Sequence, residues 1–339
     1  ERILAVLHLV GAVLMYMMAT ADDFSSFYPY VLGYMIAYMP TLALVNSVSF
    51  NQMSDPAKEF SLIRVWGTVG WIVAGLAISY LFGWDSAESI AGGGLRNTFL
   101  MSAAASLALG LFSFTLPKTP PKAKGTEAAS ISEILGLEAL TLLKERNFLI
   151  FFVSSILICI PLAFYYQQAN PFLVDVGVAN ATGKMTIGQA SEVLFMLLLP
   201  VFLKRFGIKN TLLFGMLAWA LRYLLFAYGD ADGKGFMLIL GIALHGICYD
   251  FFFVSGQIYT DAKAGERYKS AAQGLITLAT YGVGMLIGFE VAGRISNQYT
   301  DAAGKADWTA IWTMPAIFAA IVLVLFLVTF KNEKLAVES

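Results

Sequence analysis

Long apolar segments recur along the whole chain and are separated by short polar stretches. A helix that crosses the roughly 30 Å core of a bilayer needs about 20 mostly apolar residues. Ten segments come close to that length, at residues 3–20, 27–50, 61–82, 97–116, 147–173, 186–203, 210–228, 235–257, 270–293 and 309–330. Because apolar and polar residues do not alternate within them, the pattern predicts membrane-spanning helices rather than strands of a β-barrel.

The composition supports this interpretation. Hydrophobic residues make up 58% of the 339 residues and charged residues only 13%, about half of the charged share of a soluble domain. The sequence therefore predicts an all-α integral membrane protein whose surroundings are a lipid bilayer. The net charge of −1 gives no reason to expect a nucleic-acid partner. Cys159 and Cys248 both fall in apolar segments, and we expect small buried side chains rather than a disulfide.

One long polar stretch divides the predicted helices into two groups. Residues 117–146 are first rich in proline and lysine and then weakly amphipathic. We interpret them as a cytoplasmic linker whose second part lies on the membrane surface. The linker separates an N-terminal half of four helices, residues 1–116, from a C-terminal half of six helices, residues 147–339.

The distribution of basic residues predicts the orientation. If residue 1 is cytoplasmic, 15 lysines and arginines fall in cytoplasmic segments and five in outer segments, while Arg64 and Arg222 lie inside helices. Because basic residues concentrate on the cytoplasmic side, we expect both ends of this chain to be cytoplasmic.

Polar residues at membrane depth are costly, and they are therefore candidates for function. Arg64, Thr68 and Trp71 lie at spacings of four and then three residues, on one face of the helix at 61–82. This face offers guanidinium donors, a hydroxyl and a flat ring. The alternative is that Arg64 extends to the cytoplasmic boundary of the membrane.

Amides and a carboxylate occupy two further helices. Gln167 and Asn170 precede Pro171, which should distort the helix, and Gln189 and Glu192 again lie three residues apart. Burial favours the neutral form of a carboxylate, so Glu192 could carry a proton. The alternatives are hydrogen bonding between helices for the amides and an outer-interface position for Glu192.

The segment at 235–257 carries the strongest ionisable signal. Asp250 lies far from either end of this helix, next to Tyr249 and five residues after His245. We expect a functional carboxylate, and the alternative is a structural role in which Asp250 pairs with Arg222 or with another helix. The sequence has no spacing typical of a metal site, no phosphate-binding loop and no arrangement of catalytic nucleophile and base, so we predict that the protein is not an enzyme.

These motifs together resemble the nucleoside:proton symporters of the major facilitator superfamily, the bacterial nucleoside permeases. The most specific motif is R-V-W-G-T-V-G-W at 64–71, followed by Q-x-x-N at 167–170, Q-x-x-E at 189–192 and the pair Tyr249–Asp250. Their order and helix placement extend the resemblance over both halves. It implies a major-facilitator fold of twelve helices, of which this chain carries ten and lacks the first two.

The resemblance also implies a role for each candidate residue. Nucleosides would be the substrates and the proton the coupling ion, with no cofactor and no metal, in a monomer of the bacterial inner membrane. Asp250 and Glu192 would serve proton coupling, and His245 stands where the family has an aromatic residue. The implied substrate-binding residues are Arg64, Thr68, Trp71, Gln167, Asn170, Gln189, Glu192, His245 and Tyr249.

The physical character of a nucleoside agrees with this set. It is neutral, with one flat face for aromatic rings and a rim of donors and acceptors that amides can satisfy. Two alternatives stay open at this point: a proton symporter for another small polar metabolite such as a sugar, and a truncated membrane protein that does not transport. The preference between purines and pyrimidines is also open.

Overall fold

The computed structural model describes residues 1–52, 56–119 and 137–333, with the backbone alone at 43, 46–47, 50–51, 56–62, 64 and 265–270. Within these ranges the chain is helical, apart from turns, loops and one isolated bridge between Thr300 and Ala306. It divides into two compact units, Glu1–Thr126 and Glu127–Ser339. We describe each unit separately.

Unit 1 is built from long apolar helices. They are α1 (Arg2–Thr20), α2 (Phe24–Gln52), α3 (Pro56–Leu76), which continues into the π-helical segment η1 (Ala77–Leu81), the short α4 (Ala87–Ala91) and α5 (Arg96–Ser113). These helices cover the four spans predicted for the N-terminal half.

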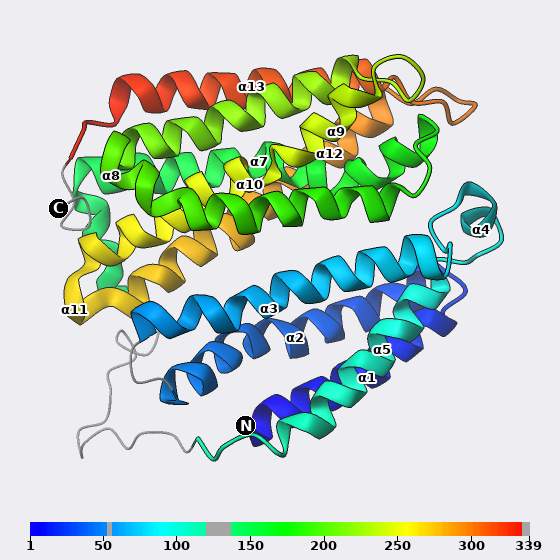
Figure 1. Ribbon diagram of the computed structural model, residues 1–339, viewed down its shortest axis with the longest axis horizontal. Coiled ribbons are helices and arrows are strands. Elements are labelled where there is room, and N and C mark those ends of the chain that lie inside the picture. The colour runs from blue at the N-terminus through cyan, green and yellow to red at the C-terminus, as the bar shows by residue number, and fades with distance from the viewer. Residues whose placement is uncertain (53–55, 120–136, 334–339) are drawn as a thin grey trace. The chain divides into compact units, whose positions relative to one another are not determined.

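Small residues let α1 and α5 lie side by side in unit 1 (Figure 1). A methyl group at Gly110 would come within 2.9 Å of the Leu9 side chain, so glycine lets the helices approach without displacing Leu9. Nearby, the Ser106 hydroxyl donates a hydrogen bond of 2.8 Å to the carbonyl of His8. Packing of this kind holds helices together where lipid removes the hydrophobic driving force between them.

Unit 2 contains the remaining predicted spans. Its helical elements are η2 (Leu137–Lys144), α7 (Arg146–Asp175), α8 (Ala181–Tyr228), α9 (Gly235–Ala243), α10 (His245–Tyr249), η3 (Asp250–Val254), α11 (Ser255–Thr277), η4 (Leu278–Gly284), α12 (Met285–Gln298) and α13 (Trp308–Thr329). Six helical stretches among the described residues are long and apolar enough to cross a membrane, five of them in this unit.

Of two predicted loops, the one at 204–209 is a break between two helices, as expected, whereas the one at 258–269 is helical. Residues 204–209 join two spans inside α8, where Gly207 adopts a φ of 74° that breaks the helix into two antiparallel parts (Figure 1). Residues 258–269, predicted as a loop, are helical and belong to α11. Alanine, lysine, glutamate and arginine in this stretch are good helix formers, which explains why a polar connection continues the helix.

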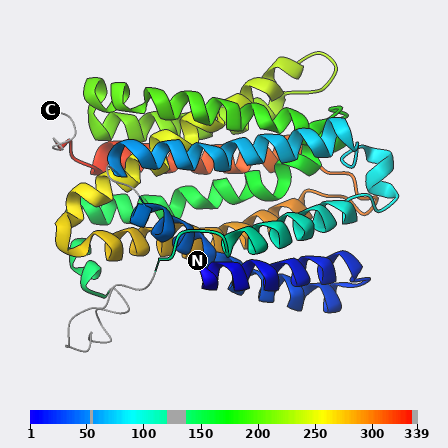
Figure 2. The same ribbon diagram turned by 60° about the horizontal axis from the view of Figure 1, so that its bottom comes forward.

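α11 contacts η2 in unit 2, as both views show (Figure 2).

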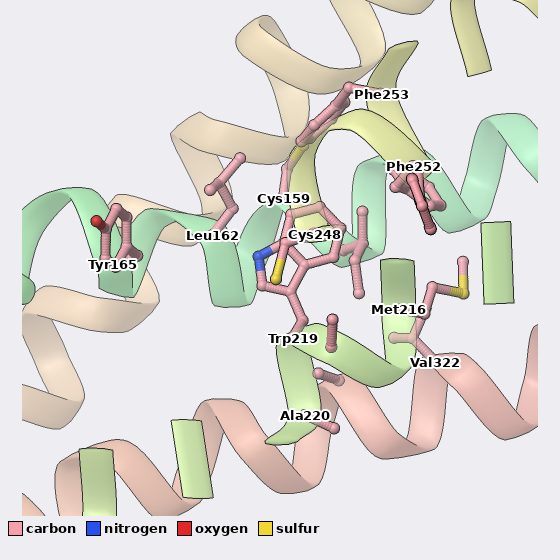
Figure 3. Close-up of a cluster of buried hydrophobic side chains, with 14 of the residues drawn as sticks. Cys159, Leu162, Tyr165, Met216, Trp219, Ala220, Cys248, Phe252, Phe253 and Val322 are labelled. Carbon is pink, nitrogen blue, oxygen red and sulfur yellow. The ribbon is translucent and has the colours of Figure 1, made fainter. Parts of the chain in front are cut away.

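The interior of unit 2 is aromatic and tightly packed. Trp219 meets Phe252 and Phe253 edge-on, with ring centroids 5.6 and 5.5 Å apart, a favourable geometry for aromatic pairs. Cys159 and Cys248 lie among these side chains as free, buried thiols (Figure 3), as expected from the sequence.

A polar network ties the end of the chain to α7 and α11 at one end of unit 2. The Glu333 carboxylate pairs with Lys263 Nζ at 2.5 Å and accepts hydrogen bonds from the Tyr259 hydroxyl and the Asn147 amide. Lys263 also pairs with Glu145 at 3.0 Å. Partial burial alone would raise the pKa of Glu333, but its bonds to Lys263 and Asn147 outweigh burial and lower that pKa below its usual range.

We expect Glu333→Gln to lower the thermal midpoint of the purified protein at neutral pH, by an amount equivalent to about 1 kcal/mol. A carboxylate with a lowered pKa in the folded state stabilises the fold above its ordinary pKa of about 4.3 and loses that contribution as the pH falls further. The difference between variant and wild type should therefore shrink below about pH 4. Glu290→Gln, which removes an exposed pair with Arg294, is the control and should change little. Equal midpoints for Glu333→Gln and wild type at pH 7 would contradict this assignment.

Candidate functional site

Polar side chains from α7, α8, α10 and η4 meet inside unit 2. The helices α8 and α10 approach so closely that their backbones touch at Gly246, whose N–H donates a hydrogen bond of 3.0 Å to the Ser191 hydroxyl. A methyl group at Gly246 would lie 2.5 Å from the Ser191 carbonyl group and 2.6 Å from the Glu192 nitrogen. Gly188 likewise lies against His245, one turn earlier on α8. These glycines place His245 beside Glu192.

Within this cluster, an array of charged and titratable side chains joins Glu192, His245 and Arg222. His245 Nε2 lies 3.8 Å from Glu192 Oε2, and His245 Nδ1 lies 3.2 Å from Arg222 Nη1. Arg222 is fully buried, and His245 is 5% exposed. The sequence places Glu192 and Arg222 on two spans of the chain, and the break at Gly207 folds these spans back on each other within α8.

An aromatic ring supports this array from α7. The guanidinium carbon of Arg222 lies 3.4 Å from the centroid of the Tyr165 ring, and His245 stacks on the same ring with centroids 5.5 Å apart. A guanidinium held over an aromatic face gains a cation–π interaction, which is strongest away from water. Tyr165 thus fixes the positions of both partners. Its place on α7 is visible in Figure 3.

A second contact links α10 to η4. The hydroxyls of Tyr249 and Tyr281 lie 2.9 Å apart, and Tyr249 also packs against Phe253 with ring centroids 5.2 Å apart. Tyr281 lies within the π-helical segment η4, and Asp250 begins the π-helical segment η3. Such segments are common at functional sites because they change the direction of the following side chains.

The other candidates of unit 2 are spread around this cluster. The Asn170 amide donates a hydrogen bond of 2.9 Å to the Thr182 hydroxyl at the start of α8. Gln167 lies near α12, where a methyl group at Gly293 would be 3.6 Å from its amide nitrogen. Gln189 is half-buried on α8, one turn before Glu192, and Asp250 is fully buried. The structure thus groups Glu192, His245 and Tyr249, and it does not bring Asn170 into direct contact with them.

The candidates of unit 1 lie on α3. Thr68 is half-buried and Trp71 is 72% exposed. The side chain of Arg64 falls outside the described part of the structure, so its predicted role stays a prediction.

Sequence reasoning missed three residues of the cluster as site residues. Arg222 carried the same signal as Arg64, a cation inside an apolar helix, but was considered only as a partner for Asp250. Tyr165 and Tyr281 carried no such signal, because single tyrosines are common in membrane helices. Among the described residues there is no group of three or more histidine, cysteine or acidic side chains suited to a metal ion.

The side chains of this cluster are of the kinds that bind small polar molecules. The cluster offers a carboxylate, an imidazole and phenol hydroxyls beside aromatic faces, inside a bundle of apolar helices.

Solved structures with similar folds define the class of protein. The crystal structure of the nucleoside transporter NupG superposes with a TM-score of 0.82 at 32% sequence identity, over 98% of this chain and 83% of that one. A bacterial homologue of the lysosomal transporter Spinster, at 14% identity, shares the fold with a TM-score of 0.69 over 97% of this chain and 82% of the other. The chain is therefore a multi-pass membrane transporter of the major-facilitator fold.

Sequence comparison identifies the family. The family described as "Nucleoside H+ symporter" matches residues 1–335. The putative nucleoside transporter YegT of Escherichia coli K12 is 44% identical over 98% of this chain and 79% of its own length. Xanthosine permease of the same organism is 34% identical over 98% of this chain and 80% of its own length. Nucleoside permease NupG, also from this organism, is 33% identical over 99% of this chain and 81% of its own length. The chain belongs to the nucleoside:proton symporter family.

The family assignment decides several expectations from the sequence. The resemblance to nucleoside permeases, the all-α major-facilitator fold and the interpretation as a transporter rather than an enzyme are confirmed. The two-part division at the linker and the roles of the individual site residues stay predictions.

Proposed function

We propose that the protein imports nucleosides together with protons across the bacterial inner membrane by alternating access. The family match over residues 1–335 carries this proposal. The polar cluster of unit 2 supports it, because hydrogen-bonding groups beside aromatic rings suit a neutral molecule with a flat base and a hydroxylated sugar. The proposed monomer needs no cofactor beyond the coupling proton, and both ends of this chain would be cytoplasmic.

The proposed roles follow the sequence motifs. Glu192 and Asp250 serve proton coupling, and Glu192 also contacts the substrate. Buried polar groups that match a substrate reject molecules that leave them unpaired. This is the physical basis for selecting nucleosides over other small polar metabolites. The proposed substrate-binding residues are Arg64, Thr68, Trp71, Gln167, Asn170, Gln189, Glu192, His245 and Tyr249.

Uptake of labelled nucleosides tests the proposal. Cells without their own nucleoside transport should accumulate labelled uridine, adenosine or xanthosine when they express the protein, and a protonophore should abolish the accumulation. An excess of unlabelled nucleoside should compete, whereas an excess of maltose should not. Competition by the sugar alone would overturn the substrate assignment, and accumulation that survives the protonophore would overturn proton coupling.

Tyr281→Phe should weaken nucleoside binding about threefold, because the Tyr249 hydroxyl loses a hydrogen-bond partner while the ring remains. Equilibrium binding of a labelled nucleoside to the purified protein measures this change. Tyr228→Phe removes a hydroxyl from an exposed tyrosine at the end of α8 and is the matched control. An unchanged dissociation constant for Tyr281→Phe would show that the tyrosine pair does not order the site.

A further inference from the structure

Arg222 is a fully buried cation of unit 2 to which the sequence motifs of the family assignment give no role. It lies on the second part of α8, with its guanidinium carbon 3.4 Å from the centroid of the Tyr165 ring and its Nη1 3.2 Å from His245 Nδ1. A cation in such a place is costly unless its surroundings hold it firmly. Its position therefore calls for a role connected with its neighbours.

The contact with His245 determines where the imidazole carries its proton. A guanidinium has only donors, so Nδ1 of His245, 3.2 Å from Arg222 Nη1, must act as the acceptor. In a neutral imidazole one nitrogen accepts and the other carries the proton. The proton therefore belongs on Nε2, the nitrogen that lies 3.8 Å from Glu192 Oε2. Arg222 thus directs an N–H group toward the side of the ring where Glu192 lies.

Tyr165 keeps this geometry in place. The His245 ring is nearly parallel to the Tyr165 ring, at 24°, and the guanidinium of Arg222 lies over that tyrosine ring as well. A tilt of the imidazole would weaken its stacking on Tyr165, and a flip of the ring would take the Nδ1 acceptor away from Arg222. The charged and titratable groups that face the imidazole or adjoin it along the chain are Arg222 and Glu192 of α8, Tyr165 of α7, and Cys248, Tyr249 and Asp250 of its own segment.

We propose that Arg222 is a positioning residue of the nucleoside site, which acts through His245 to hold an N–H donor beside the Glu192 carboxylate. The 3.8 Å between His245 Nε2 and Glu192 Oε2 is longer than a hydrogen bond. The N–H donor and the carboxylate acceptor are therefore neighbours that do not hydrogen-bond to each other in this geometry. Such a pair suits a substrate group that both donates and accepts, as a ribose hydroxyl does. The part of this inference that concerns substrate rests on the proposed function, whereas the state of His245 does not.

The chain has only two histidines, which makes the state of His245 directly measurable. In a His8→Gln background, ¹⁵N-labelled histidine leaves a single imidazole, and nitrogen NMR at neutral pH reports which ring nitrogen carries the proton. We expect a protonated Nε2 and an unprotonated Nδ1 in the absence of nucleoside. A proton on Nδ1, or on both nitrogens, would overturn the proposal. This measurement needs no variant of Arg222 and therefore does not depend on the folding of such a variant.

Arg222→Met then tests the positioning role. It should shift the imidazole away from the single Nε2–H form and weaken binding of labelled uridine about tenfold. Arg294→Met removes an exposed arginine of the same unit that pairs with Glu290 and should change neither readout. If folded Arg222→Met keeps the wild-type imidazole signals, the inference fails. Because those signals are recorded without nucleoside, a protein that shows the expected form but binds no nucleoside would count against the proposed function instead.

Discussion

Replacing Gly246 by alanine is expected to weaken nucleoside binding about a hundredfold. The new methyl carbon would lie 2.5 Å from the Ser191 carbonyl group and 2.6 Å from the Glu192 nitrogen, whereas carbon atoms in contact prefer about 3.5–4.0 Å. Both neighbours are backbone atoms, so α8 and α10 must separate by about an ångström. His245 and Glu192 would then part, and the loss of about two buried hydrogen bonds to substrate corresponds to a change of this size.

The matched control is Gly274→Ala on α11. No described atom lies within 4 Å of the place where its methyl group would be, and alanine is the better helix former. This variant should bind nucleoside like the wild type and be equally or more stable. Equal binding by Gly246→Ala, in protein that elutes as a folded species from size-exclusion chromatography, would show that the close contact of α8 and α10 does not shape the site.

Asp250→Asn is expected to abolish accumulation of nucleoside against its gradient. Asp250 is fully buried at the start of a π-helical segment of the apolar bundle. The amide has nearly the same shape as the carboxylate but cannot take up and release a proton. Coupling to one proton supports an accumulation ratio of about ten for each pH unit across the membrane, since a factor of ten corresponds to about 1.4 kcal/mol. In the variant this ratio should fall to about one.

Exchange of labelled for unlabelled nucleoside separates coupling from transport. Asp250→Asn should still exchange nucleoside across proteoliposome membranes without a proton gradient. Asp230→Asn is the control, because Asp230 is in the loop after α8. The asparagine of this variant keeps a side-chain oxygen that can accept the hydrogen bonds from the N–H groups of Gly233 and Lys234. Full accumulation by Asp250→Asn would assign proton coupling to another group, with Glu192 the next to test.

The sequence was sufficient for the helices because the signal is local. Each predicted span contains enough apolar residues in succession to cross a bilayer, and helical segments occupy all of them in the described part of the chain. The prediction of a loop at 258–269 was wrong. Charged residues predict exposure to water, whereas helix formation depends on the helix propensity of the residues. The π-helical segments at Asp250 and Leu278 follow from packing between helices, which no local pattern encodes.

The site could be predicted only in part for a similar reason. Glu192 and His245, which lie close together in the structure, were candidates because polar residues stand out in apolar helices. The contact of His245 with Arg222 spans 23 positions, and that of Tyr249 with Tyr281 spans 32. Such contacts depend on how each helix is rotated about its axis, and hydropathy leaves this rotation undetermined when lipid and protein interior are equally apolar.

The central claim is that this protein moves nucleosides together with protons, and proton movement itself tests it most directly. Purified protein is reconstituted into liposomes that enclose a pH-sensitive dye, with equal pH on both sides. Addition of uridine, adenosine or xanthosine outside should acidify the lumen, because inward movement of the nucleoside brings protons with it. Maltose should have no such effect, and Asp250→Asn should abolish the nucleoside response. Nucleoside entry without any change of lumenal pH would contradict proton symport.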